Sequence, residues 1–331
     1  MVTLIGMGSG KWEALSAQAQ QAVRSAGLVF GAKRLLAGLP ADSMARQFAL
    51  YQPADILETL AQNPGQDAVV LYSGDTGFYS GASGLLTPLR ALGIPARVYP
   101  GVSSIQLLSA ALGRPWQDWK LVSAHGCACD PVAECMMNRS VFFLTGGTET
   151  PASLCQKLTD AGMGEAHGVV GENLGTEAEA IRYGSAAELA GQSFAPLSVL
   201  LVENFDLPQL RAPGFPDESF IRSEVPMTKQ EVRAAALAKL AVMPTDTLWD
   251  VGAGTGSVSV ELALAAPKGR VYAVECEPDA CELFRKNRAK FHACNLILIE
   301  GRAPDVLADL PAPDAVFIGG TKGGMEAVLD E

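Results

Sequence analysis

The segment 249–262, WDVGAGTGSVSVEL, constrains the fold more than any other part of the chain. It reads as the end of a buried strand with Asp250, a loop of alternating glycines and the start of a helix, so the backbone can press against a ligand. A dinucleotide fingerprint needs G-x-G-x-x-G, but Ser257 stands where its third glycine would fall. A phosphate loop needs a lysine after its last glycine, and this loop has none. The loop therefore favours a nucleoside ligand without phosphates.

A second apolar run, GRVYAVECEP, predicts a neighbouring parallel strand that ends in Glu275. A carboxylate at this position can accept hydrogen bonds from both ribose hydroxyls. The pattern Asp-x-Gly-x-Gly-x-Gly with a strand-end glutamate resembles the S-adenosylmethionine site of seven-stranded Rossmann-like methyltransferases. The resemblance implies that Glu275 binds the ribose and that the Arg302-Ala303 turn lies near the adenine. It assigns the methionine end of the cofactor to Asp250, Gly252, Gly254 and Gly256.

The composition indicates a globular protein with room for two cores. The chain has 331 residues, of which 48% are hydrophobic and 18% charged. Its formal net charge of -11 argues against nucleic-acid binding, which depends on neutralising phosphates. Apolar runs stay well short of the ~18 residues of a membrane span, and the amino terminus lacks the charged region of a signal peptide. We therefore expect a cytoplasmic protein whose seven cysteines are reduced thiols.

Strand and helix patterns alternate along the chain and predict two α/β domains. Prolines and charges interrupt the patterning over 207–226, which we interpret as a linker. It separates a first domain, 1–206, with lobes of about 1–115 and 116–206, from a second domain, 227–331. The second lobe is expected to be more antiparallel than the first.

The second domain should open with a helix from Met227, where Thr228 and Glu231 form a capping box. Only four strands of the seven-stranded fold can be recognised after it. We therefore expect a domain that is incomplete at its C-terminal end, with the strand in AVFIGG on an open edge.

Four glycine-rich loops punctuate the first domain, namely GMGSG, YSGDTGFYSG, YPGVSS and LTGGTETP. Each alone is an ordinary turn. In this order they resemble the tetrapyrrole (corrin/porphyrin) methylase family over Thr3 to Asn204, which implies S-adenosylmethionine in a cleft between two lobes. In the first loop, Ser9 and Lys11 replace the family's usual proline and acid. The resemblance implies cofactor contacts from Gly8, Gly74, Asp75, Gly77, Ser103, Ser104 and Thr145.

The segment SAHGCACDPVAEC brings His125 close in sequence to Cys127, Cys129 and Cys135. The C-x-C spacing followed by a five-residue gap fits zinc poorly, so we predict no metal. His125 is instead expected to face the substrate or to stabilise its turn. Glu172 is a further substrate-side candidate, for which a structural role is favoured.

The second half resembles the decarboxylating precorrin methyltransferase domain in PGFPDESF, MTKQEVRA, EGRAPDVL and PDAVFIGG. With the first half, this implies S-adenosylmethionine-dependent methylation of a precorrin or cobalt-precorrin in cobalamin biosynthesis. The first domain would act at C5, and the second at C15 with decarboxylation of the C12 acetate. Within MTKQEVRA, Met227 and Thr228 would approach the cofactor. Lys229 and Arg233 would meet substrate carboxylates, unless Lys229 is only a solvated charge at a helix start.

Two other functions stay open at this point. The chain could be a truncated or regulatory form that binds cofactor and is active only at C5, or a methylase of another tetrapyrrole such as a sirohaem precursor. In each case we expect a tetrapyrrole as the small-molecule partner. We also expect a homo-oligomer, because an open sheet edge favours association.

Overall fold

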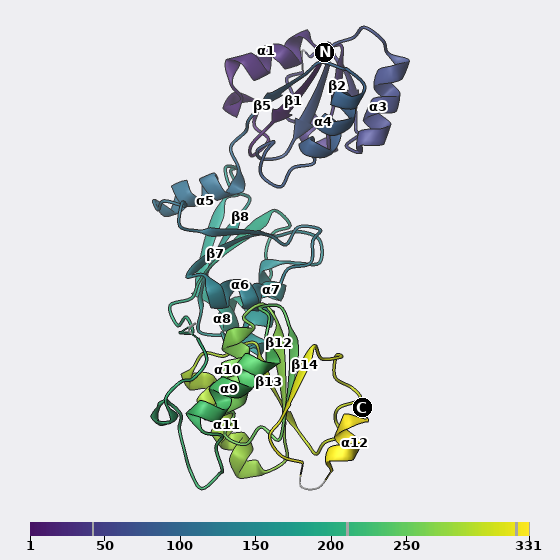
Figure 1. Ribbon diagram of the computed structural model, residues 1–331. Helices are drawn as coiled ribbons and strands as arrows, with labels where there is room; N and C mark the ends of the chain where they lie inside the picture. The colour runs from purple at the N-terminus through teal and green to yellow at the C-terminus, as the bar shows by residue number, and fades with distance from the viewer. Residues whose placement is uncertain (42, 210–211, 322–323, 331) are drawn as a thin grey trace. The chain divides into compact units, whose positions relative to one another are not determined.

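The computed structural model describes residues 1–41, 43–209, 212–321 and 324–330, and it contains three sheets (Figure 1). The chain divides into two compact units. One consists of 1–118, 170–182 and 195–199, and the other of 119–169, 183–194 and 200–331. In the described part of the chain, no helix is both long and apolar enough to span a membrane.

The first sheet has five strands in the order β3-β2-β4-β1-β5, and its pairings are parallel. Its strands are β1 (Val2–Gly6), β2 (Leu28–Phe30), β3 (Arg46–Phe48), β4 (Ala68–Tyr72) and β5 (Ala96–Tyr99). The connecting helices are α1 (Ala17–Ser25), α2 (Lys33–Leu36), α3 (Pro53–Gln62) and α4 (Ala82–Ala91). Separate apolar clusters cover the two faces of the sheet, which explains why β1 is buried along its whole length.

Three loops meet at the carboxyl ends of β1, β4 and β5, and their backbones touch. A Cβ atom on Gly101 would lie 2.3 Å from the Gly74 carbonyl oxygen and 2.5 Å from that of Gly6. The Asp75 carboxylate accepts the N–H groups of Gly77 at 2.8 Å and Gly101 at 3.1 Å. Only residues without side chains permit this packing, so the glycines of these loops position the edge of the sheet.

The second sheet has the strand order β6-β7-β10-β8-β9. Its strands are β6 (Lys120–Ser123), β7 (Ser140–Leu144), β8 (His167–Glu172), β9 (Ala180–Ser185) and β10 (Ser198–Glu203). The helices of this region are α5 (Ser104–Leu112), α6 (Pro131–Met137), α7 (Pro151–Asp160) and α8 (Ala186–Ala190). Its strands β6 and β7 pair in parallel, and the expectation of a more antiparallel lobe stays a prediction.

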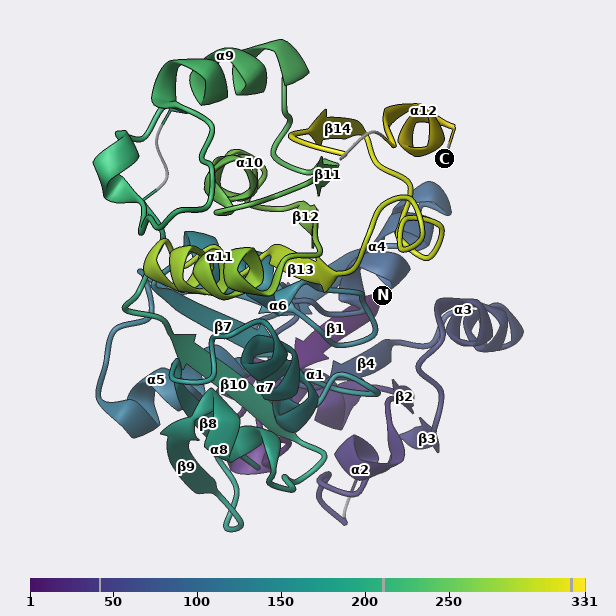
Figure 2. The same ribbon diagram turned by 90° about the horizontal axis from the view of Figure 1, so that it is seen from below.

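The third sheet is parallel, with the order β13-β12-β11-β14. Its strands are β11 (Thr247–Val251), β12 (Arg270–Glu275), β13 (Leu296–Glu300) and β14 (Ala315–Ile318). Its helices are α9 (Gln230–Leu240), α10 (Ser257–Ala265), α11 (Pro278–Lys290) and α12 (Met325–Leu329). Figure 2 shows α9, α10 and α11 on one face of the sheet and α12 on the other. The expected edge position of β14 is confirmed within the described residues.

The start of α9 differs from the prediction. The helix begins at Gln230, its N-cap is Lys229, and no side chain caps it, so the capping box of Thr228 and Glu231 is wrong. The reason is tertiary, because the Thr228 carbonyl accepts a hydrogen bond from the buried guanidinium of Arg233. Upstream, Phe215 and Phe220 are buried in the core beneath α10. Part of the segment interpreted as a linker is therefore packed into this core, while the domain division itself stays a prediction.

We predict that Gly101→Ala destabilises the first sheet by about 1–3 kcal/mol, because its methyl group would overlap two carbonyl oxygens. Gly81→Ala is the matched control. At that position φ is -65° and the new methyl would only touch Tyr72 at 3.7 Å, so we expect a change within about 0.5 kcal/mol. Amide hydrogen exchange in β1 measures both effects. Unchanged protection in Gly101→Ala would show that the loops are not close-packed.

Candidate active site

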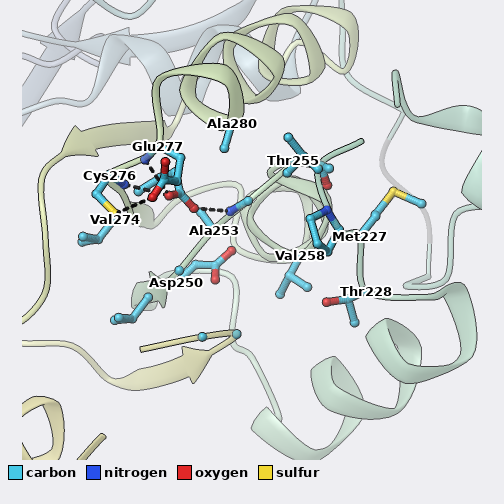
Figure 3. Close-up of a pocket in the computed structure, with 18 of the residues that line it drawn as sticks. Met227, Thr228, Asp250, Ala253, Thr255, Val258, Val274, Cys276, Glu277 and Ala280 are labelled. Atoms are coloured by element: carbon cyan, nitrogen blue, oxygen red, sulfur yellow. Dashed lines mark hydrogen bonds between the residues drawn. The ribbon is translucent and has the colours of Figure 1, made fainter. Parts of the chain in front are cut away.

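A cavity of about 830 Å³ opens at the carboxyl ends of β11 and β12 in the C-terminal domain (Figure 3). The loops after these strands, the end of β14 and the segment 224–228 form its wall. In open α/β sheets, ligands bind where the strand order reverses, which here is between β11 and its neighbours β12 and β14. The volume suits a nucleoside-sized molecule.

The loop after β11 follows a path that requires its glycines. Gly252, Gly254 and Gly256 have φ values of 76°, 55° and 76°, in the left-handed region. A Cβ on Gly252 would lie 2.3 Å from the Gly320 carbonyl oxygen, and one on Gly256 would lie 2.6 Å from the Phe284 ring. Gly252 and Gly254 line the cavity, whereas Gly256 packs against α11. The structure therefore gives Gly256 a packing role.

The strand-end carboxylate of Glu275 holds two cavity loops together. One oxygen accepts the N–H of Gly254 at 2.8 Å, and the other accepts those of Cys276 at 2.7 Å and Glu277 at 2.9 Å (Figure 3). Glu275 is 8% exposed and lines the cavity, so its remaining lone pairs can meet a ligand. The residue predicted to bind ribose thus also fixes the loops around it.

Asp250 and Thr255 bring unsatisfied polar atoms to the cavity. Asp250 is buried, and its Oδ2 accepts a hydrogen bond from the Ser259 hydroxyl. Within the described residues, neither the other Asp250 oxygen nor the Thr255 hydroxyl has a hydrogen-bond partner. Burial raises the pKa of Asp250 to about 7. Buried polar atoms of this kind fit a ligand that carries hydrogen-bond donors, such as an ammonium group.

The remaining predicted residues of this domain divide into two groups. Met227 and Thr228 reach the cavity from the side opposite Cys276 and Glu277 (Figure 3), and Arg302 and Ala303 line it as well. Lys229 and Arg233 do not belong to the wall. Lys229 is exposed, with its Nζ 3.7 Å from the Asp217 carboxylate.

The expectation that Arg233 contacts substrate is wrong, because its side chain is completely buried. Its periodic position on α9 places it inside the domain, where it pairs with Glu261. A sequence pattern indicates that a residue is charged, but it does not show which charges find a partner in the core.

In the first domain, the predicted cofactor residues gather at the carboxyl ends of β1, β4 and β5. Gly8 and Gly74 exchange backbone hydrogen bonds of 3.1 and 2.9 Å. Asp75 braces the loops as described above, and Gly77 lies within them. Ser103 caps α5, since the Gln106 side chain accepts its N–H at 2.8 Å, and Ser104 is the first residue of that helix. Thr145 follows β7 and belongs to the other compact unit.

His125 and Glu172 both have structural partners. The His125 Nδ1 lies 3.3 Å from the Thr145 carbonyl oxygen, and a Cβ on Gly146 would overlap it at 1.8 Å. Glu172 is buried and accepts hydrogen bonds from Arg182 Nε at 2.5 Å and from the Ala195 N–H at 2.6 Å. The geometry thus supports turn stabilisation by His125 and the structural role that we favoured for Glu172.

The cysteines near His125 differ in their surroundings. Cys127 is exposed, whereas Cys135 is buried. Burial raises the pKa of Cys135, with smaller contributions from Glu134 and other neighbouring groups. No group of three or more His, Cys, Asp or Glu side chains is placed to hold a metal ion in the described ranges.

Sequence reasoning missed several residues of the cavity wall, including Thr255, Val258, Cys276 and Glu277. The last two directly follow the strand-end Glu275, so their positions were a usable signal. Glu224 comes from the segment 224–228, which only tertiary packing brings to the cavity.

Two family models match different parts of the chain. Residues 1–190 match the family model of tetrapyrrole (corrin/porphyrin) methylases, and 219–331 match that of the precorrin methyltransferase domain. A precorrin-6Y C(5,15)-methyltransferase [decarboxylating] from Sinorhizobium sp is 32% identical over 338 residues, which cover 99% of this chain and 81% of that protein. A probable cobalt-precorrin-6B C(15)-methyltransferase (decarboxylating) from Sulfolobus acidocaldarius is 53% identical over 116 residues, covering 34% of this chain and 60% of that protein.

A solved structure shares the fold of the first part of the chain. A uroporphyrin-III C-methyl transferase from Thermus thermophilus, complexed with S-adenyl homocysteine, matches with a TM-score of 0.51. It is 20% identical, and the match covers 61% of this chain and 91% of that one. At this identity the similarity shows the fold alone.

The fold and the matches define a tetrapyrrole methylase joined to a precorrin methyltransferase domain. The match to the Sinorhizobium relative runs through both parts of this chain, since it covers 99% of the chain. The chain therefore belongs to the family of decarboxylating precorrin-6Y C5,15-methyltransferases.

The buried Asp250 predicts an unusual pH dependence of stability. Its pKa of about 7 in the folded protein exceeds its usual value of 3.8. The protonated Asp250 stabilises the folded state, and this contribution is at its maximum below about pH 4. It is lost as the pH rises through 7, and the free energy of unfolding then falls by up to about 4 kcal/mol.

We expect Asp250→Asn to remove this dependence, because the amide does not titrate. The free energy of unfolding of the variant and of the wild type is measured in urea, without cofactor, at pH 5 and pH 8. Hydrogen exchange in β11 monitors the unfolding. The same pH dependence in both proteins would show that Asp250 is ionised in the folded state at both values.

Proposed function

We propose that this chain methylates a precorrin or cobalt-precorrin twice with S-adenosylmethionine in cobalamin biosynthesis. The N-terminal domain would act at C5. The C-terminal domain would act at C15, with loss of the C12 acetate carboxyl group as CO2. The single observation that carries the cofactor assignment is the cavity at β11 and β12. Glu275 lies at one strand end, and at the other lies an Asp250 oxygen without a hydrogen-bond partner among the described residues.

The residues of the C-terminal cavity fit the parts of S-adenosylmethionine. Glu275 would accept the ribose hydroxyls, and Arg302 with Ala303 would lie near the adenine. The Asp250 oxygen and the Thr255 hydroxyl, which lack partners among the described residues, would take the amino-acid end. The Gly252 to Gly254 backbone would lie against the cofactor, because no side chain intervenes there.

The charge of the cavity also fits this cofactor. Its described wall carries several carboxylates and a single guanidinium, that of Arg302. The carboxylates are Glu224, Asp250, Glu275, Glu277 and Asp279. An acidic surface attracts a sulfonium cation and repels phosphates, in agreement with the absence of a phosphate-binding sequence from the loop.

The main role of the protein in this reaction would be to position the methyl donor and the substrate. When bound, S-adenosylmethionine supplies a methyl group that its sulfonium already activates, and a ring carbon of the substrate is the nucleophile. The glycine loop and the segment 224–228 would hold the donor in line with that carbon, and Val258 and Met227 would exclude water. Such positioning can lower the activation free energy by roughly 7–11 kcal/mol, so no base triad is required.

The substrate-side assignments are less direct. In the first domain, the glycine loops after β1, β4 and β5 and Ser103 would bind cofactor, and the contact expected from Thr145 stays a prediction. Lys229 is exposed and could contact a substrate carboxylate only after leaving Asp217. A homo-oligomer stays a proposal. Among the described residues β14 lies at the edge of its sheet, where backbone groups can pair with another strand.

Titration calorimetry with S-adenosylhomocysteine tests both domains. We expect two binding sites in the wild type, because each domain supplies its own glycine loops. Gly254→Arg should remove the C-terminal site, since the side chain would enter a cavity in which a Cβ already lies 3.4 Å from the Pro226 carbonyl oxygen. Gly77→Arg should remove only the N-terminal site.

Product analysis by mass spectrometry completes the test. A C15-methylated, decarboxylated product from the wild type is expected, and its loss in Gly254→Arg should leave C5 methylation intact. A single calorimetric site that Gly254→Arg does not change would contradict the bifunctional proposal. Only C5 methylation would then be expected from this chain.

A further inference from the structure

Arg233 forms a buried hydrogen-bond network beside the C-terminal cavity. Its Nε donates to Glu261 Oε1 at 2.9 Å, and its Nη1 donates to Asp217 Oδ1 at 2.8 Å and to the Thr228 carbonyl. Its Nη2 donates to the Phe215 carbonyl at 2.5 Å. All three guanidinium nitrogens are therefore used, and two of their acceptors are backbone carbonyls of the chain that enters the domain.

Glu261 completes the network from α10, the helix that begins at the glycine loop. Its side chain is fully buried, and its carboxylate accepts the N–H groups of Gly214 at 2.5 Å and Phe215 at 3.1 Å. The Arg233 guanidinium also lies over the Phe220 ring, 4.7 Å from its centroid. One ion pair thus joins the segment 214–228 to the helix that carries the cofactor loop.

A buried ion pair is a poor source of stability, because desolvation offsets most of its attraction. Apolar side chains of similar volume would hold α9 against α10 equally well. They would not fix backbone carbonyls in place, whereas a planar guanidinium with five donors does so with defined geometry. The network is therefore better explained by the position of the segment that it holds than by stability.

The end of that segment forms the cavity wall. Residues 224–228 line the cavity, and the Pro226 carbonyl oxygen is 3.4 Å from the position of a Cβ on Gly254. The guanidinium binds the Thr228 carbonyl directly. We propose that Arg233 is a positioning residue that fixes segment 224–228 against the glycine loop and thereby sets cofactor affinity at the C-terminal site.

This inference rests on the proposed function of the cavity, and Arg233→Lys tests it. Lysine keeps the charge, but its single nitrogen cannot reach Glu261, Asp217 and both carbonyls together. We expect S-adenosylhomocysteine to bind about tenfold more weakly at the C-terminal site, with unchanged binding at the N-terminal site. The KM for S-adenosylmethionine in C15 methylation should rise more than kcat falls, because the wall contacts the cofactor before the reaction.

Lys239→Gln is the matched control, since Lys239 is an exposed cation near the end of the same helix. It should leave both affinities unchanged. Thermal unfolding shows whether the variants are folded. If Arg233→Lys does not fold, Asp217→Asn serves as the test variant. The Asp217 side chain is 23% exposed, so this substitution weakens only the outer contact of the Arg233 network. We then expect about threefold weaker binding at the C-terminal site alone.

The outcomes separate the two proposals. A folded Arg233→Lys protein with wild-type C-terminal affinity and KM would overturn the positioning role. If Arg233→Lys does not fold, unchanged C-terminal affinity in Asp217→Asn would overturn the positioning role as well. A wild-type protein without any C-terminal site would instead contradict the function proposed for the cavity.

Discussion

Close contact between backbones at the carboxyl ends of parallel strands is the constraint on which both domains depend. In the first domain, a Cβ on Gly6 or Gly101 would overlap the Gly74 carbonyl oxygen, and in the C-terminal domain a Cβ on Gly252 would overlap that of Gly320. Each contact is secured by a carboxylate that accepts loop N–H groups, Asp75 in one domain and Glu275 in the other. Two different strand orders therefore use the same solution. The loops become fixed donors and surfaces for a ligand, because their own polar groups are satisfied within the protein.

Electrostatics then distinguishes the ligands that the C-terminal cavity can hold. A buried carboxylate with one oxygen lacking a partner in the described residues is costly, and its pKa rises to about 7 in response. A cationic ligand would reverse that penalty, since an opposite charge favours the ionised form. Arg233 and Glu261 show the other way to bury charge, because each is fully satisfied by its partners and by backbone groups. Asp250 can therefore interact with a cationic ligand, whereas the Arg233–Glu261 pair holds the cavity wall in place.

Local patterns predicted the features that depend on local chemistry. The glycine loop, the strand-end Glu275 and the order of strands and helices in the last domain follow from residue type and spacing, and the structure places them together. The start of α9 was predicted three residues too early, at Met227 instead of Gln230. The burial of Arg233 and the arrival of Glu224 at the cavity depend on contacts between distant segments. Amphipathic spacing places a residue on a face of its helix, but the partner on the next helix decides whether that face buries a charge.

The described residues of the C-terminal cavity and of the Arg233 network come from the second half of the chain. The cavity wall runs from Glu224 to Thr321, and the network extends back to Gly214. The match to the precorrin methyltransferase domain begins at 219, within the segment that this network anchors. A domain that began after this segment would lack Phe215 and Phe220 in its core, and of the guanidinium acceptors described above only Glu261 would remain. The segment interpreted as a linker therefore includes residues from 214 onward that pack into the C-terminal core and lead into the cavity wall.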